Sequence, residues 1–227
     1  MTNPRYQHDI VVMDRSGSIR EILQGMQEGF REFISAQGAL HVSQGGELES
    51  VTASLWQFDD KIDQVGSFEP VGNLASYMIV PRGNTALYDA IGRAVTTEGE
   101  ALAAMSEDQR PGQVVVIIAS DGRENWSKEW DGGKVRELLE RQQRDYGWQV
   151  IYLGTNQDAF SEARKIGAQN VNSVLSYKSS NAGTQKAWRG TSAAVGRFSH
   201  DFLGAGVAAS VSYNDEERTA AQADDEK

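Results

Sequence analysis

The sequence predicts a doubly wound α/β fold, in which helices cover both faces of a mostly parallel sheet. Short apolar runs rich in β-branched residues alternate with segments whose apolar residues recur at the helical period. The longest apolar run, residues 113–119, lies between Pro-Gly and Ser-Asp-Gly, as expected of a buried central parallel strand. No repeat, low-complexity block or linker interrupts the series. We therefore expect one domain of Rossmann-like architecture.

The first part of the chain predicts a strand, a helix and a hairpin. Residues 8–13 form a buried strand that ends at Asp14, and residues 19–34 place apolar side chains on one face of a helix. Segments 49–58 and 61–68 both alternate between apolar and polar residues across a short polar turn. They are expected to form an antiparallel hairpin that supplies an edge of the sheet.

The second part of the chain continues the alternation after a loop punctuated by Pro81 and Gly83. Asn84 or Thr85 is expected to cap the helix that follows this loop. The remaining predicted elements are, in order, a strand at 113–119, a helix at 134–144, a strand at 148–153, a helix at 157–166, a strand at 171–175 and a helix at 184–202.

Charge and cysteine content exclude several classes of function. The chain has 22 basic and 32 acidic residues and no run of Lys or Arg, so it lacks the basic surface that binds nucleic acid or anionic membrane. It has no cysteine, which excludes disulfides, Cys-ligated zinc, iron–sulfur clusters and thiol nucleophiles. Any metal ion must be held by oxygen or imidazole.

The two ends of the chain define the expected domain limits. The N-terminus has no signal-peptide pattern and no window resembles a membrane span, which predicts a cytoplasmic protein. The segment 214–227 has six acidic residues and two basic ones. We therefore expect a folded domain over residues 5–203 and a disordered acidic tail over residues 204–227.

Oxygen-bearing side chains follow two of the predicted strands. Asp14 closes the first strand and Asp121 closes the central one, while Ser16 and Ser18 follow Asp14 across a tight turn and Thr85 begins a separate helix. If the two strands are neighbours, two carboxylates and three hydroxyls converge at the carboxyl edge of the sheet. This donor set suits a hard cation, Mg²⁺ first, with Mn²⁺ or Ca²⁺ as alternatives. DRSGS alone has a simpler interpretation, a polar turn that caps the next helix.

These residues resemble the von Willebrand factor A (vWA) family, whose metal-ion-dependent adhesion site (MIDAS) has the pattern D-x-S-x-S, a later threonine and a later [ST]-D-G. The three parts are present in order as DRSGS, RGNTALYDAIG and IIASDGREN. The resemblance extends over residues 7–202 and is strongest to stand-alone members that bacteria and their phages encode. It implies a six-stranded sheet of order 3-2-1-4-5-6 with one antiparallel edge strand.

The resemblance also implies a site and a way of binding. Asp14, Ser16, Ser18 and Thr85 would be direct or near-direct ligands of a divalent ion, and Asp121 a direct or water-mediated one. An Asp or Glu of a partner protein would complete the coordination of the ion. Departures from the common pattern are Arg15, within DRSGS, and Asn84, before the threonine.

Four residues are candidates for contact with that partner: Arg15, Asn84, Trp126 and Trp130. The two tryptophans follow the Asp121 loop and are either exposed interface anchors beside the ion or a cover for the next helix.

The function favoured by these observations is divalent-cation-dependent capture of an acidic residue on a protein partner. One alternative is a metal-dependent hydrolase or phosphatase. Against it, the P-loop, G-x-G-x-x-G and G-x-S-x-G motifs are absent. Position 16 is also a serine, where a phosphatase of this architecture would have its second acidic residue. Another is a structural or assembly component, such as a phage subunit, with a vestigial metal site.

Overall fold

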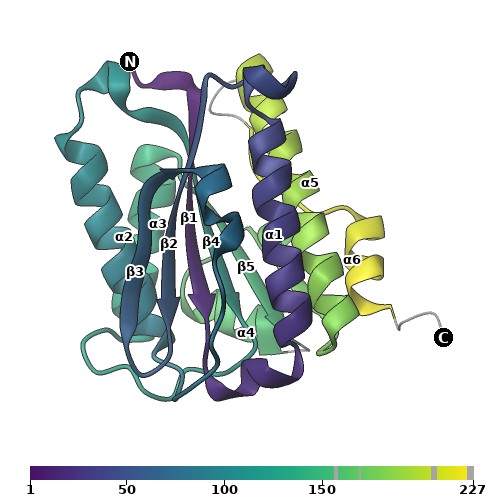
Figure 1. Ribbon diagram of the computed structural model, residues 1–227. Coiled ribbons are helices and arrows are strands. Elements are labelled where there is room, and N and C mark those ends of the chain that lie inside the picture. Colours follow the sequence, from purple (N-terminus) through teal and green to yellow (C-terminus); the bar gives the residue numbers. More distant parts are fainter. Residues whose placement is uncertain (156–157, 169, 206–208, 224–227) are drawn as a thin grey trace.

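The computed structural model, which describes residues 1–155, 158–168, 170–205 and 209–223, has a six-stranded sheet between two layers of helices (Figure 1). The elements are β1 (Asn3–Asp14), α1 (Leu23–Ala39), β2 (Ser50–Phe58), β3 (Ile62–Pro70), α2 (Leu87–Ala104), β4 (Pro111–Ser120), α3 (Gly132–Tyr146), β5 (Gln149–Thr155), α4 (Asp158–Lys165), β6 (Val174–Tyr177), α5 (Asn181–Ala205) and α6 (Asp215–Gln222). No helix in the described ranges is long and apolar enough to cross a membrane.

The strand order is β3-β2-β1-β4-β5-β6, and every neighbouring pair is parallel except β2 and β3. The predicted fold class, strand order and antiparallel edge strand are therefore confirmed. β1 lies between β2 and β4, with Asp14 paired to Phe58 and Met13 paired to Ala119. The carboxyl ends of these three strands consequently meet at one edge of the sheet, the lower edge in Figure 1.

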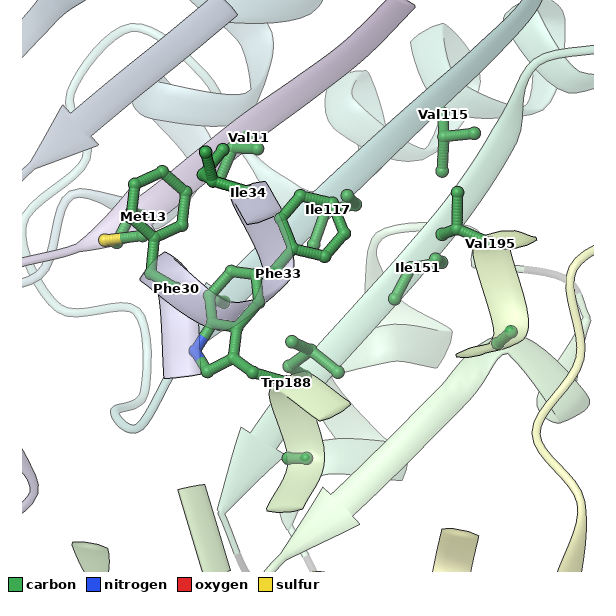
Figure 2. Packing of buried hydrophobic residues seen from close by; sticks show 14 of the residues in the cluster. Val11, Met13, Phe30, Phe33, Ile34, Val115, Ile117, Ile151, Trp188 and Val195 are labelled. Atoms are coloured by element: carbon green, nitrogen blue, oxygen red, sulfur yellow. The ribbon is translucent and has the colours of Figure 1, made fainter. Parts of the chain in front are cut away.

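Alternation along the strands divides the core into two layers. In β1, Val11 and Met13 face α1 and α5, whereas Ile10 and Val12 face the layer formed by α2, α3 and α4. In the first layer Trp188 of α5 lies against Phe30 and Phe33 of α1 (Figure 2). Because both faces of the central strands are buried against helices, each of these strands contains a continuous apolar run in the sequence.

The helix after the 81–86 loop begins differently from the prediction. Neither Asn84 nor Thr85 caps it; α2 begins at Leu87 after Ala86, with no side-chain capping hydrogen bond. Because Thr85 does not cap α2, its side chain is available for other contacts.

The last predicted strand is also displaced, because residues 171–173 form a 3₁₀ turn and β6 begins at Val174.

The expectation of a disordered tail from residue 204 is wrong for residues 209–223. Val211 and Tyr213 are buried in the α1–α5 layer, and the Tyr213 hydroxyl lies 2.8 Å from that of Thr191. α6 then begins with a capping box between Asn214 and Glu217. Acidic residues in its first turn favour the helix through its dipole, so the charge that suggested disorder stabilises this end.

Asp9 is an acidic residue buried in the core, away from the carboxyl edge. Its Oδ1 accepts a hydrogen bond from Gln7 Nε2 at 2.9 Å, and its Oδ2 has no partner among the described residues. Burial raises the pKa of Asp9 from 3.8 to about 7, although the bond from Gln7 opposes the shift. The ionised carboxylate is therefore the less stable form inside the fold.

Asp9→Asn is expected to stabilise the protein at neutral and basic pH. A raised folded-state pKa means that the contribution of Asp9 to wild-type stability is greatest below about 3.8 and is lost as pH rises through about 7, where half of the buried carboxyl groups are ionised. The difference in free energy of unfolding between Asp9→Asn and wild type should grow across this interval to a few kcal/mol. Urea denaturation at pH 4 to 8 measures it, with exposed Asp201→Asn as control. A pH-independent difference would contradict the expectation.

Candidate metal centre

The five predicted ligands lie on three loops at the carboxyl edge of the sheet. Asp14 ends β1, and Ser16 and Ser18 follow it in a tight 3₁₀ turn. Thr85 lies in the loop before α2, and Asp121 directly follows β4. Because β1 and β4 are neighbours, the structure brings together the residues that the sequence placed far apart.

Asp14 lies at the base of the site. Its side chain is buried; Oδ1 accepts a hydrogen bond from the Ser16 amide at 2.7 Å, and Oδ2 accepts one from the Ser120 hydroxyl at 2.5 Å. Burial raises the pKa of Asp14 to about 6, against the lowering effect of the bonds from Ser120 and Ser16. Among the described groups that shift this pKa, none is a cation.

The hydroxyls form a chain from Asp14 to Asp121. Ser16 Oγ lies 3.1 Å from Ser18 Oγ, which donates to Asp121 Oδ1 at 2.8 Å. A Cβ built on Gly122 would lie 3.3 Å from Thr85 Oγ1 and 3.8 Å from Ser18 Oγ. The absence of a side chain at Gly122 therefore keeps open the space that these hydroxyls face.

Asp121 is held from both sides of its loop. Its backbone oxygen accepts a hydrogen bond from the Thr155 hydroxyl at 2.8 Å, while its carboxylate accepts from Ser18. Burial raises the pKa of Asp121, as it does that of Asp14. Two carboxylates with raised pKa values thus lie at one edge, beside Ser hydroxyls.

Arg15 is placed differently from the prediction. Its side chain is buried and forms ion pairs with Asp59, at 2.7 Å from Nε to Oδ2, and with Asp63. It is therefore part of the scaffold and does not present a cation to a partner. This placement follows from the pairing of β1 with β2, since the Arg15 amide donates to the Phe58 backbone oxygen at 2.8 Å and Asp59 directly follows Phe58.

Asp59 connects three loops below the site. Its carboxylate accepts hydrogen bonds from Arg15, from Arg82 Nε at 2.6 Å and from the Lys61 amide at 2.7 Å. Burial alone would raise the pKa of Asp59, but the bonds from Arg82, the Lys61 amide and Arg15 together hold it below its usual value. The backbone oxygen of Asp59 also accepts from the Ala86 amide. The Asp14 loop and the Thr85 loop are thereby tied to the same residue.

The loop that carries both tryptophans is organised by Asp89 of α2. The Asp89 carboxylate accepts hydrogen bonds from the amides of Lys128, Glu129 and Trp130 at 2.7–2.9 Å. Trp130 lies over Gly92 of α2, where a Cβ would come within 2.1 Å of its ring. Trp130 therefore covers α2, the helix that precedes it in the chain, whereas the sequence analysis named the next helix as the one it would cover.

Trp126 and Asn84 remain at the surface. Trp126 is 42% exposed, with Lys128 Nζ 5.1 Å from its ring centroid, and Asn84 is exposed beside Thr85. Both lie next to the candidate ligands in sequence or space, since the Trp126 amide donates to the Thr85 backbone oxygen. They are the partner-binding candidates that the structure leaves accessible.

Three residues with a role at the site were missed from the sequence. Ser120 donates to Asp14, Asn125 Oδ1 accepts from the Thr85 amide at 3.0 Å, and Asp59 anchors two loops. Ser120 carried a signal, because it is the first residue of the S-D-G segment. Asn125 and Asp59 have no local pattern that distinguishes them from ordinary loop residues.

The arrangement fits a hard divalent cation in its donor chemistry. All five side chains offer oxygen, Asp14 is buried without a compensating cation, and Gly122 leaves room at the hydroxyls. No cluster of three or more His, Cys, Asp or Glu side chains suited to a metal ion occurs in the described ranges. With only two carboxylates, the ion would depend on hydroxyls, water and a ligand from another molecule to complete its coordination.

Comparison with solved structures supports the fold. The chain is similar to proximal thread matrix protein 1 from the mussel byssus, with a TM-score of 0.59 and 20% identity over 81% of this chain and 46% of that one. It is similar to the vWF domain of the type V pili tip protein Mfa5 from Porphyromonas gingivalis, with a TM-score of 0.59 and 10% identity over 84% and 95%. It is also similar to the TRAP protein of Plasmodium vivax, with a TM-score of 0.51 and 14% identity over 84% and 72%.

Two of the similar structures carry metal ions. One of the mussel structures has a zinc-occupied MIDAS motif, and the Plasmodium structure is manganese-loaded. The chain spans about half the length of the mussel protein. No protein-family model and no curated protein matches the sequence. The sheet order and these structural similarities together establish that the chain has the von Willebrand factor A fold.

Proposed function

We propose that this protein is a binding module that uses a divalent cation, Mg²⁺ in the first instance, to capture an acidic side chain of a partner protein. Asp14, Ser16, Ser18, Thr85 and Asp121 hold the ion, and the partner supplies a further carboxylate oxygen. Trp126 and Asn84 contact the partner beside the ion.

The observation that carries this proposal is the state of Asp14. The Asp14 carboxylate is buried, its pKa is raised, and no cation is among the groups that shift this pKa. Ionising it is therefore costly, and a bound cation would offset that cost. The two acidic ligands only balance the charge of a divalent ion, and the hydroxyl ligands are neutral, so the ion stays electrophilic and can accept a further carboxylate oxygen. The metal-bearing structures of the same fold give the proposal further support.

Asp14→Asn tests the ion-binding step. Wild-type protein should unfold at a higher temperature in millimolar MgCl₂ or MnCl₂ than in EDTA, because a ligand selective for the folded state stabilises it by about 2.7 kcal/mol at a hundred times its Kd. The variant should lose this divalent-dependent shift. Asp145→Asn serves as a matched control, since its exposed carboxylate lies at the far end of α3 and should leave the shift intact.

Partner capture is tested by a pull-down with wild-type and Asp14→Asn protein in Mg²⁺ and in EDTA. Binding should require both Mg²⁺ and Asp14, and Trp126→Ala should weaken it while preserving the divalent-dependent thermal shift. Partner capture that persists in EDTA would overturn the proposal. A phosphatase screen in Mg²⁺ addresses the hydrolase alternative: turnover abolished by Asp14→Asn would assign the same residues to catalysis.

A further inference from the structure

Residues 77–80 form an extended segment between β3 and α2, alongside α1 (Figure 1). Tyr77 has extended backbone angles, with φ at −64° and ψ at 138°. Burial then alternates along the chain, because Ile79 is buried in the α1–α5 layer whereas Met78 and Val80 are 58% and 66% exposed. The segment therefore lies on the core as a strand does, with one side chain directed inward and its two neighbours outward.

One backbone edge of this segment is already paired. The side-chain amide of Gln27 on α1 donates from Nε2 to the Tyr77 backbone oxygen, and its Oε1 accepts from the Ile79 amide at 2.8 Å. In an extended chain the backbone groups of alternate residues point to the same side. The Gln27 amide thus takes the place of a neighbouring strand on the α1 side and holds the segment extended.

The opposite backbone edge is unpaired. The N–H and C=O groups of Met78 and Val80 belong to that edge, and within the described ranges they take part in no hydrogen bond. An unpaired strand edge is a template for pairing with another chain. With two exposed apolar side chains on one face, this short edge has the features of a site that adds a strand from a partner.

The segment leads directly to the candidate metal centre. Two residues after Val80, the Arg82 amide donates to the Arg15 backbone oxygen at 2.8 Å, and the Gly17 amide donates to the Gly83 backbone oxygen at 3.2 Å. An extended chain spans about 3.3 Å per residue, so Val80 lies within about 7 Å of Arg82. A partner strand on the unpaired edge would therefore bring a residue about three positions further along it to the ion.

The charges beside the segment favour an acidic partner. Arg31 lies at its Met78 end, with Nη2 3.1 Å from the Met78 sulfur, and Arg20 lies at its other end, with Nη2 3.5 Å from the Pro81 backbone oxygen. Neither guanidinium pairs with a carboxylate in the described part of the chain. Together with Glu28 they are the charged residues that line the groove between the segment and α1, which leaves one positive charge in excess. This sign is opposite to the net charge of −10 on the whole chain.

We infer that residues 77–80 bind an extended, acidic segment of the partner protein, which adds a strand at Met78 and Val80 and places its Asp or Glu on the ion. The inference rests on the proposed function, because the carboxylate that binds the ion belongs to the same partner segment. Backbone pairing supplies affinity that is independent of the partner's sequence, whereas the ion and the two arginines select for acidic residues.

The probe is the peptide acetyl-DGSVTVSGD-amide, in which β-forming residues lie at the centre and an acidic residue lies three positions beyond them in either direction. It is titrated into the full ¹⁵N-labelled chain in Mg²⁺ and followed by NMR, and chemical-shift changes should be largest at the Met78 and Val80 amides. Methylating the backbone nitrogens of its two valines, or those of its threonine and two serines, blocks opposite edges of the peptide. One methylated peptide should fail to bind and the other should bind as the parent does. Equal binding of both would overturn the inference.

Two substitutions at one position separate loss of the edge from loss of the side chain. Val80→Pro removes an N–H donor of the edge and should weaken binding of the peptide about tenfold, whereas Val80→Thr keeps the donor and should bind within about twofold of wild type. Val80 already precedes a proline and its amide forms no hydrogen bond in the described ranges, so both variants should fold and keep the divalent-dependent thermal shift. Wild-type affinity in Val80→Pro would refute the strand edge.

The strand edge and the cation-dependent function fail in different ways. If both hold, the parent peptide should bind more weakly in EDTA than in Mg²⁺, and the peptide acetyl-NGSVTVSGN-amide should bind in Mg²⁺ as weakly as the parent does in EDTA. Binding that requires Mg²⁺ and the aspartates but is unchanged in Val80→Pro would overturn the strand edge alone. Binding that requires Val80 and the methylation-sensitive edge of the peptide, but is indifferent to Mg²⁺ and the aspartates, would overturn the cation-dependent function and retain the backbone pairing.

Discussion

Asp59→Ala is expected to lower the free energy of unfolding by on the order of 3 kcal/mol, because it leaves the buried guanidinium of Arg15 without its main partner. Asp59 also binds Arg82 and the Lys61 amide, so the Asp14 loop and the loop before Thr85 lose their common anchor. The variant should therefore also bind divalent ions more weakly than wild type. Urea denaturation and the divalent-dependent thermal shift measure the two effects.

Asp63→Ala is the matched control for this prediction. Asp63 pairs with the same Arg15, but its side chain is 49% exposed. Because solvent reaches the Asp63 carboxylate, its ion pair with Arg15 is screened, and its loss should cost only about 1 kcal/mol. Equal losses of stability in the two variants would show that burial of Asp59 is not what makes its ion pair important.

Trp188→Ala is expected to cost about 3–5 kcal/mol of stability, the usual loss for truncating a buried tryptophan. The indole lies 5.7 Å from the Phe30 ring and 5.4 Å from the Phe33 ring, centroid to centroid (Figure 2). Its close approach to Gly29 brings α1 and α5 together, since a Cβ there would come within 2.6 Å of the ring. Removing the indole leaves a cavity between the two helices that cover one face of the sheet.

Trp126→Ala provides the comparison for Trp188→Ala. It removes the same side chain from an exposed loop, where its main ring contact is with Lys128. Its loss should be no more than about 1 kcal/mol, so the midpoints of urea denaturation of the two variants should separate clearly. Similar midpoints would contradict the assignment of Trp188 to the core and Trp126 to the surface.

The strands of the sheet could be predicted because their local patterns agree with their tertiary environment. The apolar run ending at Ala119 is buried on both faces in β4, and the alternating segment before Asp59 is β2. Residues 209–223 are ordered contrary to the prediction for the opposite reason. Val211 and Tyr213 become buried only because α1 and α5 provide a surface for them, and no periodicity in so short a segment indicates this.

The candidate ligands could be named because each lies where a strand ends or a helix begins, and those positions are visible in the sequence. The burial of Arg15 was not visible, because it depends on Asp59 and Asp63, more than forty positions away. The same holds for Asp89, an ordinary helical residue in sequence, which binds three amides of the 128–130 loop.

The sequence by itself determined the α/β class, the order in which strands and helices occur, and the set of oxygen donors at the carboxyl edge. Hydrophobic periodicity and turn residues are local properties, and they were sufficient for these features. The tertiary structure decided which donors face the same space and which charges are paired below them. Those features arise from contacts between residues distant in the chain, and only the packed fold brings such residues together.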